Sequence, residues 1–510
     1  MEDCCNLEVD VNGQETFLVD KKILASFSCR LNKLFEKSRG ATKNLKVIFH
    51  DFPGGAEGFE LIATFCYNNG RIDITPSNIF LLHCAANFME MNVDSRGKLS
   101  LSRQIKKYFE GIHFWTWSKF VVGLKQCQDL FLVMNSSHML QEFLDCLVGR
   151  LVLPYDASPY TSSSDRSSFQ FSGDISLDSM RNYSSQTLWW FEDLVFLDTD
   201  LFEKVIGTML SHKFNHTTLS SFIFYYRKSR FVGASILERC KITETVISLL
   251  CLLDESSISC RGLFETFRVD LNLKISKCCK IKLESLIGPQ LDQATLDDLL
   301  VPPPPWKKYA YDVNLILRLL KVFLLDSSKI FSQNQLKKIA GLMDLYMAEV
   351  APDRCLKLSK FVALAMALPD SARDSHDGVY RAMDMYLEVH NGLCEEEKIR
   401  LCCALNYDKL SPGTLGQLAQ NTKFPPIAVV TAIVSQQSKL KKLPKDANHL
   451  KTFSDWPVCS NKKGIGAKKV SEQIFLRAKN YDFPSHCEKL RLQMQGIPWK
   501  VVKLEEVCKT

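Results

Sequence analysis

Apolar side chains recur at helical spacing over much of this 510-residue chain, from Leu188 to about Leu440. Segments such as VNLILRLLKVFLL, LKKIAGLMDLYMAEV and LKLSKFVALAMALP repeat their apolar residues three to four positions apart. This spacing places the side chains on one face of a helix, and the alternation typical of strands is missing. In WWFEDLVFLDTDLFEKVIGTML, the residues near one stripe are Trp190, Leu194, Leu197, Leu201 and Val205. We therefore predict an all-α domain over residues 188–440, interrupted by turns.

The first 95 residues differ because they mix short strands with helices. TFLVD and LKVIFHDF alternate apolar and polar side chains and predict half-buried strands. Between them, KKILASFSCRLNKLFEKS has helical spacing, and PGG at 53–55 breaks the chain. A one-faced helix follows from Phe59 until NNG, and TPSNIFLLHCAANFMEM predicts another through Met91. We expect a small domain of strands and helices over residues 1–95 and a helical extension over residues 96–152.

Two segments have compositions that do not favour a packed core. Residues 153–187 are rich in serine, with eleven serines between 156 and 187, and predict a linker that carries phosphorylation sites. From Ser438 to Thr510 the chain has 16 Lys and Arg against 7 Asp and Glu, a balance of +9, whereas the whole chain carries +7. Residues 441–510 therefore predict a basic, partly disordered C-terminal tail. It would attract anionic lipid, nucleic acid or an acidic partner, with a merely solvated tail as the alternative.

Several function classes receive little support from the sequence. No run of about 18 apolar residues is present, and MEDCCNLEVD lacks the order of a signal peptide, so we expect a cytoplasmic protein, with peripheral contact at the plasma membrane as an alternative. The 19 cysteines include no C-x-x-C pair, and His212 and His216 lack the glutamate of a zinc-protease motif. Trp456 and Trp499 are too sparse for a nucleic-acid stacking track. We expect no metal, no cofactor, no nucleic-acid partner and no catalytic activity.

The stretch PDSARDSHDGVYRAMDMYLEVH at 369–390 resembles a metal or active site at first sight. Four potential ligands, Asp370, Asp374, His376 and Asp377, lie within eight positions. The stretch could hold a metal or simply begin a helix. The periodic run that follows favours a helix start, with Asp377 as N-cap and Asp374 or Ser375 as alternatives. Tyr380, early in that helix, is a candidate phosphotyrosine because added phosphate would favour the positive helix end. The alternative is that Tyr380 is a packing residue.

Three N-terminal segments, FLVDKKILASFSCRLNKLF, DFPGGAEGFELIATFCYNNG and ITPSNIFLLHCAANFMEM, resemble the BTB/POZ fold. That resemblance implies dimerisation and, for many such domains, binding to cullin-3 as an adaptor of a ubiquitin ligase. The family's cullin-contact helix corresponds to the helix that contains Phe59, Glu60 and Ile62, which are the candidate contact residues. Leu61 stands where known adaptors carry an acid, and Glu60 lies one residue early.

Later segments resemble the plant non-phototropic hypocotyl 3 family, in which a BTB/POZ domain precedes an all-helical domain. The resemblance rests on WWFEDLVFLDTDLFEKVI, IGPQLDQATLDDLLVP, YDVNLILRLLKVFL and the long run from YMAEVAPDRCLKLSKFVALAMALPDSARDSHDGVYRAMDMYLEVH to NTKFPPIAVVTAIV. It implies an α+β BTB/POZ domain followed by a mainly α-helical domain. Family members act as adaptors in phototropin signalling and related plant processes.

The chain departs from the family at two places. The family's usual Arg-Leu-Pro-Leu-Arg is replaced by TKFPP at 422–426, and its Phe-x-Glu-Gln by VSQQ at 434–437. No sustained heptads follow, so the sequence is similar to a short, divergent member. The resemblance implies a substrate-specific adaptor of a cullin-3 ubiquitin ligase, a non-catalytic phosphoprotein that dimerises with itself or a related chain. The target would be a phototropin-like kinase or another protein. The alternative is a ubiquitin-independent signalling scaffold at the plasma membrane.

Overall fold

The structure is a computed structural model, and it describes residues 6–37, 45–92, 100–135, 137–152, 189–270, 273, 275–303, 307–325 and 332–442. The predicted linker 153–187 and nearly all of the predicted tail 441–510 lie outside the described residues. The chain forms two compact units, Met1–Leu286 and Ile287–Thr510. Their boundary falls inside the helical domain predicted for residues 188–440, and the other predicted domain boundaries stay predictions.

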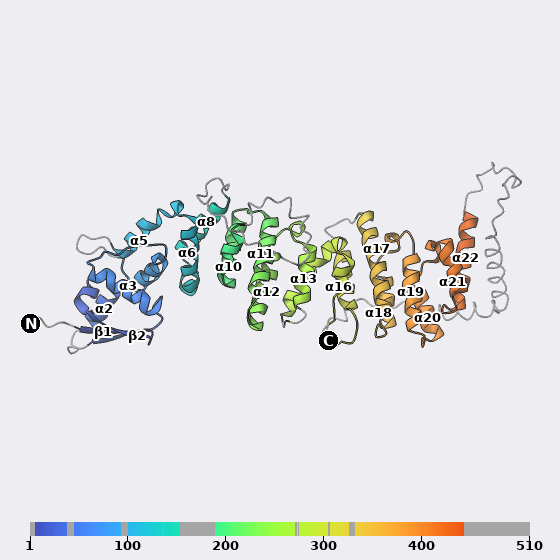
Figure 1. The fold of residues 1–510 in the computed structure, drawn as a ribbon, viewed down its shortest axis with the longest axis horizontal. Coiled ribbons are helices and arrows are strands. Elements are labelled where there is room, and N and C mark those ends of the chain that lie inside the picture. Colours follow the sequence, from blue (N-terminus) through green and yellow to red (C-terminus); the bar gives the residue numbers. More distant parts are fainter. Residues whose placement is uncertain are drawn as a thin grey trace, which may run out of the picture. The chain divides into compact units, whose positions relative to one another are not determined.

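A small sheet occupies the N-terminal end of the first unit (Figure 1). Its strands are β1 (Asn6–Val11), β2 (Glu15–Asp20) and β3 (Leu45–Phe49), in the order β2-β1-β3. β1 pairs antiparallel with β2 and parallel with β3. Asn12 and Gly13, in the turn between β1 and β2, both have positive φ, which these two residue types adopt easily. The two strands expected from the sequence are β2 and β3, and the central strand β1 was not predicted.

The sheet buries one face and leaves the other exposed. Alternate residues such as Val9 and Val11 of β1 are fully buried, whereas Leu18 of β2 is 75% exposed. This is the usual result when successive side chains of a strand point to opposite faces. The helices of this part are α1 (Lys21–Ala25), α2 (Cys29–Lys37), α3 (Gly55–Tyr67) and α4 (Ile79–Phe88). Phe59 of α3 lies in the aromatic cluster beneath the sheet, 5.0 Å from the Phe17 ring.

The segment predicted as one helix over residues 21–38 is two helices, α1 and α2, and Ser28 explains the break. Its hydroxyl donates to the carbonyl of Met89 at 2.7 Å and accepts from the amide of Leu31 at 3.2 Å. A serine that bonds in this way caps a new helix in place of continuing the old one. The bond also ties the start of α2 to the end of α4.

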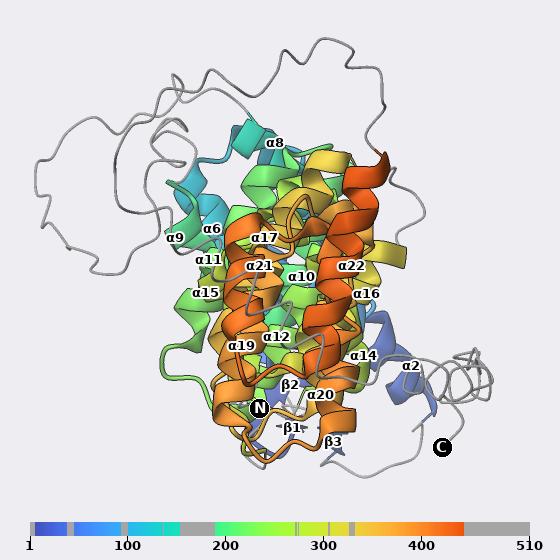
Figure 2. The same cartoon turned by 90° about the vertical axis from the view of Figure 1, so that its right-hand side faces the viewer.

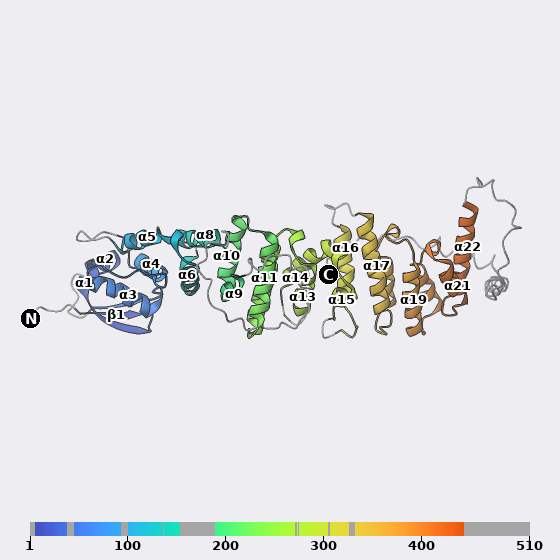
Figure 3. The same cartoon turned by 45° about the horizontal axis from the view of Figure 1, so that its top comes forward.

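Helices make up the rest of the first unit. They are α5 (Leu101–Phe109), α6 (Trp117–Asp129), α7 (Phe131–Met134), α8 (His138–Val152), α9 (Phe191–Leu194), α10 (Thr199–Ser211), α11 (His216–Phe231), α12 (Ile236–Leu250), α13 (Cys260–Asp270) and α14 (Lys277–Ile287). Helix α12 packs against both α10 and α11 (Figure 1), and α9 packs against α11 (Figure 3). Cap residues mark several helix starts, since Asp198, Asn215 and Ser235 each accept from an amide of the following turn.

Within its described residues, the second unit has helices as its only regular secondary structure. It contains η4 (Gly288–Gln293), α15 (Leu296–Leu299), α16 (Val313–Leu325), α17 (Gln333–Val350), α18 (Leu358–Ala365), η5 (Asp370–Ala372), α19 (Asp377–Val389), α20 (Glu395–Cys402), η6 (Tyr407–Lys409), α21 (Pro412–Gln420) and α22 (Pro426–Lys442). Helices α17 and α19 pack along each other, and α21 packs on α22 (Figure 2). The prediction of a mainly helical chain with a small N-terminal mixed segment is thus confirmed for the described residues. None of the helices in the described part combines the length and the apolar character needed to cross a membrane.

Candidate functional site

Helix α3 exposes a narrow polar face and buries the two apolar residues predicted to contact cullin-3. Phe59 and Ile62 are fully buried, whereas Glu60 is exposed and Leu61 is half-buried. Phe59 and Ile62 therefore belong to the core, and a partner approaching this helix would meet Glu60 instead. The exposed residues on the helix are Glu57, Glu60, Thr64 and Tyr67. If cullin-3 binds α3, it would contact these exposed residues. Cullin-3 binding itself stays a prediction.

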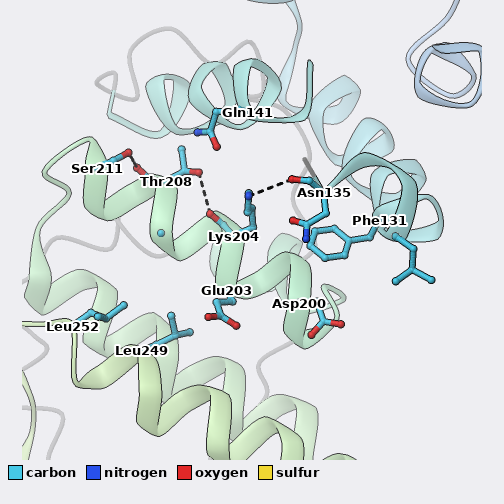
Figure 4. Close-up of a pocket in the computed structure, with 12 residues that line it drawn as sticks. Phe131, Asn135, Gln141, Asp200, Glu203, Lys204, Thr208, Ser211, Leu249 and Leu252 are labelled. Atoms are coloured by element: carbon cyan, nitrogen blue, oxygen red, sulfur yellow. Dashed lines mark hydrogen bonds between the residues drawn. The ribbon is translucent and has the colours of Figure 1, made fainter. Parts of the chain in front are cut away.

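A groove runs along α10 in the first unit, between α7 and α8 on one side and α12 on the other (Figure 4). Its volume is about 780 Å³, within the range of pockets that bind small molecules. The lining residues are Phe131, Leu132, Asn135, Gln141, Asp200, Glu203, Lys204, Gly207, Thr208, Ser211, Leu249 and Leu252. We call this site the α10 groove.

The polar groups of the α10 groove are only partly engaged. The ammonium of Lys204 donates to the carbonyl of Asn135 at 3.3 Å, and Asp200 pairs with Lys241 at 3.0 Å. Glu203 has neither a hydrogen bond nor an ion pair within the described residues. Leu132 is 96% exposed and Leu252 is 60% exposed. Apolar side chains beside a free carboxylate suit a protein segment that carries apolar and basic residues.

Gly207 makes the floor of the α10 groove open. A Cβ atom added at this helical position would meet no atom within 4 Å. A larger side chain could therefore fill the groove without disturbing the packing of α10. The groove was not predicted from the sequence, because it joins segments around residues 131–141, 200–211 and 249–252. The lone glycine within the apolar repeat of α10 was the available signal.

A smaller pocket of about 330 Å³ contains a cysteine and a histidine in contact. The thiol of Cys146 lies 3.4 Å from Nδ1 of His113. Burial raises the pKa of the Cys146 thiol, and the carboxylates of Glu142 and Asp145 raise it further. A catalytic cysteine needs the opposite shift, toward the thiolate. The pair therefore resembles a structural contact more than a nucleophile and its base.

The Asp-His stretch at 369–390 bonds mainly to residues outside it, although Nε2 of His376 also lies 3.4 Å from Oδ1 of Asp370. Asp374 pairs with Lys337 at 2.8 Å, and Asp370 pairs with Lys409 at 3.0 Å. Nδ1 of His376 accepts from the amide of Asn406 at 3.2 Å. His212 and His216 are likewise separated, since they bond to Asp145 and Asp254 respectively. Within the described residues, no group of three or more His, Cys, Asp or Glu side chains could hold a metal ion.

The predicted N-cap of the helix in this stretch is wrong. His376 occupies the cap position of α19 without a side-chain hydrogen bond, and Asp377 is the first helical residue. The Asp377 carboxylate accepts instead from the amide of Ser411 at 2.9 Å, at the start of α21. Neither alternative is the N-cap: Ser375 lies one residue before it, where its hydroxyl accepts from the Asp377 amide at 3.1 Å, and Asp374 pairs with Lys337. The Asp377 carboxylate thus joins two helices and does not cap its own.

Tyr380 is 3% exposed in the packed second unit. Its ring stacks on Phe424 with centroids 5.2 Å apart, and its hydroxyl accepts from Nδ2 of Asn421 at 3.3 Å. Burial raises the pKa of the Tyr380 hydroxyl. This environment favours the packing role, and a kinase would reach the hydroxyl only after the start of α19 had opened. Phosphorylation of Tyr380 stays a prediction.

The segment at 422–426, which departs from the usual family sequence, is integrated into the same contact. Phe424 is 4% exposed and supplies the ring beneath Tyr380. Lys423 pairs with both Asp384 and Glu388 of α19, each at 3.0 Å. The residues at 422–426 thus contact α19 through a stacked ring and two ion pairs.

Comparison with known proteins places the chain. Residues 188–414 match the NPH3 family. A BTB/POZ domain-containing protein of Arabidopsis thaliana is 41% identical, covering 100% of this chain and 94% of that protein. Two others from the same plant are 32% and 31% identical, covering 84% and 99% of this chain and 87% and 83% of their own lengths. No solved structure gives a significant match. The similarity over the full length, together with the match of the helical region, shows that the chain belongs to the NPH3 (non-phototropic hypocotyl 3) family of BTB/POZ domain-containing proteins.

Proposed function

We propose that this protein is a substrate-specific adaptor of a cullin-3 ubiquitin ligase, which promotes ubiquitination of a target protein in plant signalling. The family membership and the BTB/POZ names of the relatives support an adaptor. In this proposal residues 1–95 form the BTB/POZ domain, dimerise and contact cullin-3 through the exposed face of α3. The observation that carries the ligase half is that this face presents Glu57 and Glu60 to solvent beside the half-buried Leu61.

The target would dock in the α10 groove. The groove combines exposed leucines with the Glu203 carboxylate, which has no partner among the described residues, and this suits a segment carrying apolar and basic residues. The protein itself would be non-catalytic, which the family membership supports. The Cys146 thiol is also a poor nucleophile, because burial and nearby carboxylates raise its pKa. Ubiquitin transfer would be carried out by the other components of the ligase.

The ligase half is tested with the full-length chain and purified cullin-3. We expect measurable binding by calorimetry, and weakening of about tenfold for Glu57→Lys/Glu60→Lys, corresponding to about 1.4 kcal/mol. Glu396→Lys, an exposed position on α20, is the control and should bind as the unmodified chain does. Absence of cullin-3 binding by a dimeric preparation would remove this half of the proposal.

The target half is tested by proximity labelling in plant cells. Gly207→Leu should fill the α10 groove and abolish labelling of a target whose ubiquitination depends on the protein. Gly341→Leu, on α17, is the matched control, because a Cβ added there also meets no atom within 4 Å. Equal labelling by both variants would exclude the groove as the docking site and leave the cullin-3 result unaffected.

A second candidate function is a ubiquitin-independent signalling scaffold of the phototropin-pathway type. The balance of +9 from Ser438 to Thr510 favours peripheral contact with an anionic plasma membrane from the cytoplasmic side. Such a scaffold would bind anionic liposomes in a salt-sensitive manner. Its removal would leave the abundance of a phototropin-like kinase, or of any other bound protein, unchanged. A fall in target ubiquitination after removal would exclude this alternative.

A further inference from the structure

Three large apolar side chains are exposed close together where α11 ends and α12 begins. Val232 is 84% exposed, Ile236 is 71% exposed and Leu237 is 81% exposed. Gly233 lies between them with φ of +78°, in the left-handed region, which ends α11 and turns the chain toward α12. Single exposed apolar residues are common on protein surfaces, but a contiguous group commonly marks a binding surface. We call these residues, with the arginines described next, the α11–α12 turn surface.

Arginines surround the same turn. The guanidinium groups of Arg227 and Arg239 lie 5.6 Å and 5.9 Å from the centre of the Phe231 ring. Arg230 follows Arg227 by three residues and lies close enough to the hydroxyl of Tyr226 to lower its pKa, although burial raises that pKa overall. Arginines that share an aromatic ring present planar, forked donors to a carboxylate or a phosphate.

The hydrogen bonding of two of these arginines is incomplete. The Nε atoms of Arg230 and Arg239 are buried and have no acceptor among the described residues. A buried donor without an acceptor costs free energy that a bound anion can recover. The carboxylate of Glu238 is already held by the amide of Ser235 at 2.8 Å, and Asp200 pairs with Lys241. Glu238 also lies near enough to Arg230 for that charge to lower the pKa of its carboxyl. Neither acid, however, bonds to the Nε atoms of Arg230 and Arg239. The turn surface therefore suits an added anionic segment with apolar side chains.

The chain itself contains a segment with this chemistry. Residues 165–180 read DRSSFQFSGDISLDSM, with three aspartates against one arginine. Their apolar residues are Phe169, Phe171, Ile175, Leu177 and Met180. We propose that residues 165–180 bind to the α11–α12 turn surface of the same chain, with the aspartates on the arginines and the apolar side chains on Val232, Ile236 and Leu237.

The point at which this segment rejoins the described chain makes the contact reachable. The chain resumes at Trp189, and the Phe191 ring lies 5.5 Å from the Tyr225 ring of α11. Tyr225 precedes Arg230 by five residues, which is about 7 Å along a helix. The nine residues from Met180 to Trp189 can span up to about 30 Å. The tether therefore keeps residues 165–180 near the surface at an effective concentration of about 1 mM.

Trypsin cleavage of the full-length chain tests the proposal, because Arg166 and Arg181 provide cleavage sites in and beside the segment. If the segment binds the surface with an affinity of about 0.1 mM, the tether gives a bound-to-free ratio of about 10, and cleavage slows correspondingly. Charge reversal in Arg230→Glu/Arg239→Glu should accelerate cleavage at both bonds by about tenfold, measured by mass spectrometry. High salt should accelerate it in the unmodified chain. Ser176→Asp, which adds a negative charge, should slow it.

Two further variants keep the test independent of misfolding. Ile236→Ser/Leu237→Ser changes only exposed side chains and should also accelerate cleavage. Lys338→Glu, an exposed charge reversal on α17 of the second unit, should not. The cleavage rate should not depend on protein concentration. Equal rates in the unmodified chain and in both surface variants would overturn the proposal, and so would a slowing that appears only as concentration rises, because the contact would then join two copies.

Discussion

The guanidinium of Arg373 donates through Nε to the Asp344 carboxylate at 2.9 Å, and both side chains lie in the packed interior between α17 and the start of α19. Only 2% of the Arg373 side chain and 18% of the Asp344 side chain are exposed. Burial raises the pKa of Asp344, although the charge of Arg373 opposes that shift. The intact pair therefore contributes little net stability, because both charges lose their hydration on burial. Removal of one partner, however, would leave the other charge buried and uncompensated.

Removal of one partner should show this dependence. We expect Arg373→Met to lower the free energy of unfolding of the second unit by about 3–5 kcal/mol, because Asp344 would be left buried and uncompensated. Arg373→Met/Asp344→Leu should recover much of the loss. Denaturant-dependent hydrogen exchange of the α17 and α19 amides measures the loss of unfolding free energy in the single and in the double variant. The control is Lys337→Met, which breaks the exposed pair with Asp374 and should cost about 0–1 kcal/mol. A similar cost for the two single variants would contradict the assignment.

Close approach of the same two helices requires a glycine at 378. A Cβ added to Gly378 would lie 2.8 Å from Oδ2 of Asp344 and 3.0 Å from its Cβ. Gly378→Ala should therefore destabilise the second unit by about 1–3 kcal/mol, as overpacking does. Gly341→Ala, on the open side of α17, should instead stabilise it by about 0.5–1 kcal/mol through helix propensity. Thermal unfolding of the two variants distinguishes them, and stabilisation by both would show that the helices can separate without cost.

The sequence predicted the helices that form these contacts, but it did not predict the contacts themselves. Helical periodicity located α16, α17 and α19, because their apolar faces are local patterns of three and four residues. It also indicated that Phe59 and Ile62 lie on the buried face of α3, which conflicts with their role as contact residues in the family comparison. Strand β1 was missed although Leu7, Val9 and Val11 alternate with polar residues.

The remaining features depend on residues that are distant in the sequence. Arg373 and Asp344 are 29 residues apart, so nothing local pairs them. The N-cap at the start of α19 was misassigned because the Asp377 carboxylate bonds to Ser411, which is 34 residues later. The α10 groove and the α11–α12 turn surface depend on which side chains stay exposed after packing. Exposure is a property of the packed helices, and a single amphipathic pattern does not determine it.

Two substitutions at Tyr380 distinguish a buried packing residue from an accessible phosphorylation site. Tyr380→Phe keeps the stack on Phe424 and loses the hydrogen bond from Asn421, so we expect a loss of about 0.5–1.5 kcal/mol in unfolding free energy. Tyr380→Glu should cost about 3 kcal/mol or more, because it places a charge in the interior near Asp384. Urea unfolding measures both values. Equal stability of the two variants would indicate that the hydroxyl faces solvent, and phosphopeptide maps that repeatedly show Tyr380 unmodified would count against the phosphotyrosine prediction.

The lowered pKa of His376 predicts that the stability of α19 depends on pH. Burial lowers the pKa of His376, and the nearby charge of Arg373 lowers it further, whereas Asp370 raises it and Lys409 lowers it. Nδ1 accepts the amide proton of Asn406, so a proton on Nδ1 would break that bond. The unfolded chain, with a histidine pKa of about 6.5, therefore binds the proton more readily than the folded chain. Stability should fall as pH drops through and below this value, with a slope of at most about 1.4 kcal/mol per pH unit.

Native-state hydrogen exchange of the α19 amides between pH 7.5 and 5.5, corrected for the intrinsic exchange rate, measures this slope. His376→Gln removes the titrating group and should flatten the dependence, although it lowers stability at every pH. His138→Gln is the control, since the His138 side chain is 94% exposed on α8 and its removal should leave the α19 slope unchanged. The same slope in the unmodified chain and in His376→Gln would show that a titrating group other than His376 governs the response. A slope of the opposite sign would mean that the folded chain holds the His376 proton more tightly, which requires Asp370 to outweigh burial and Arg373.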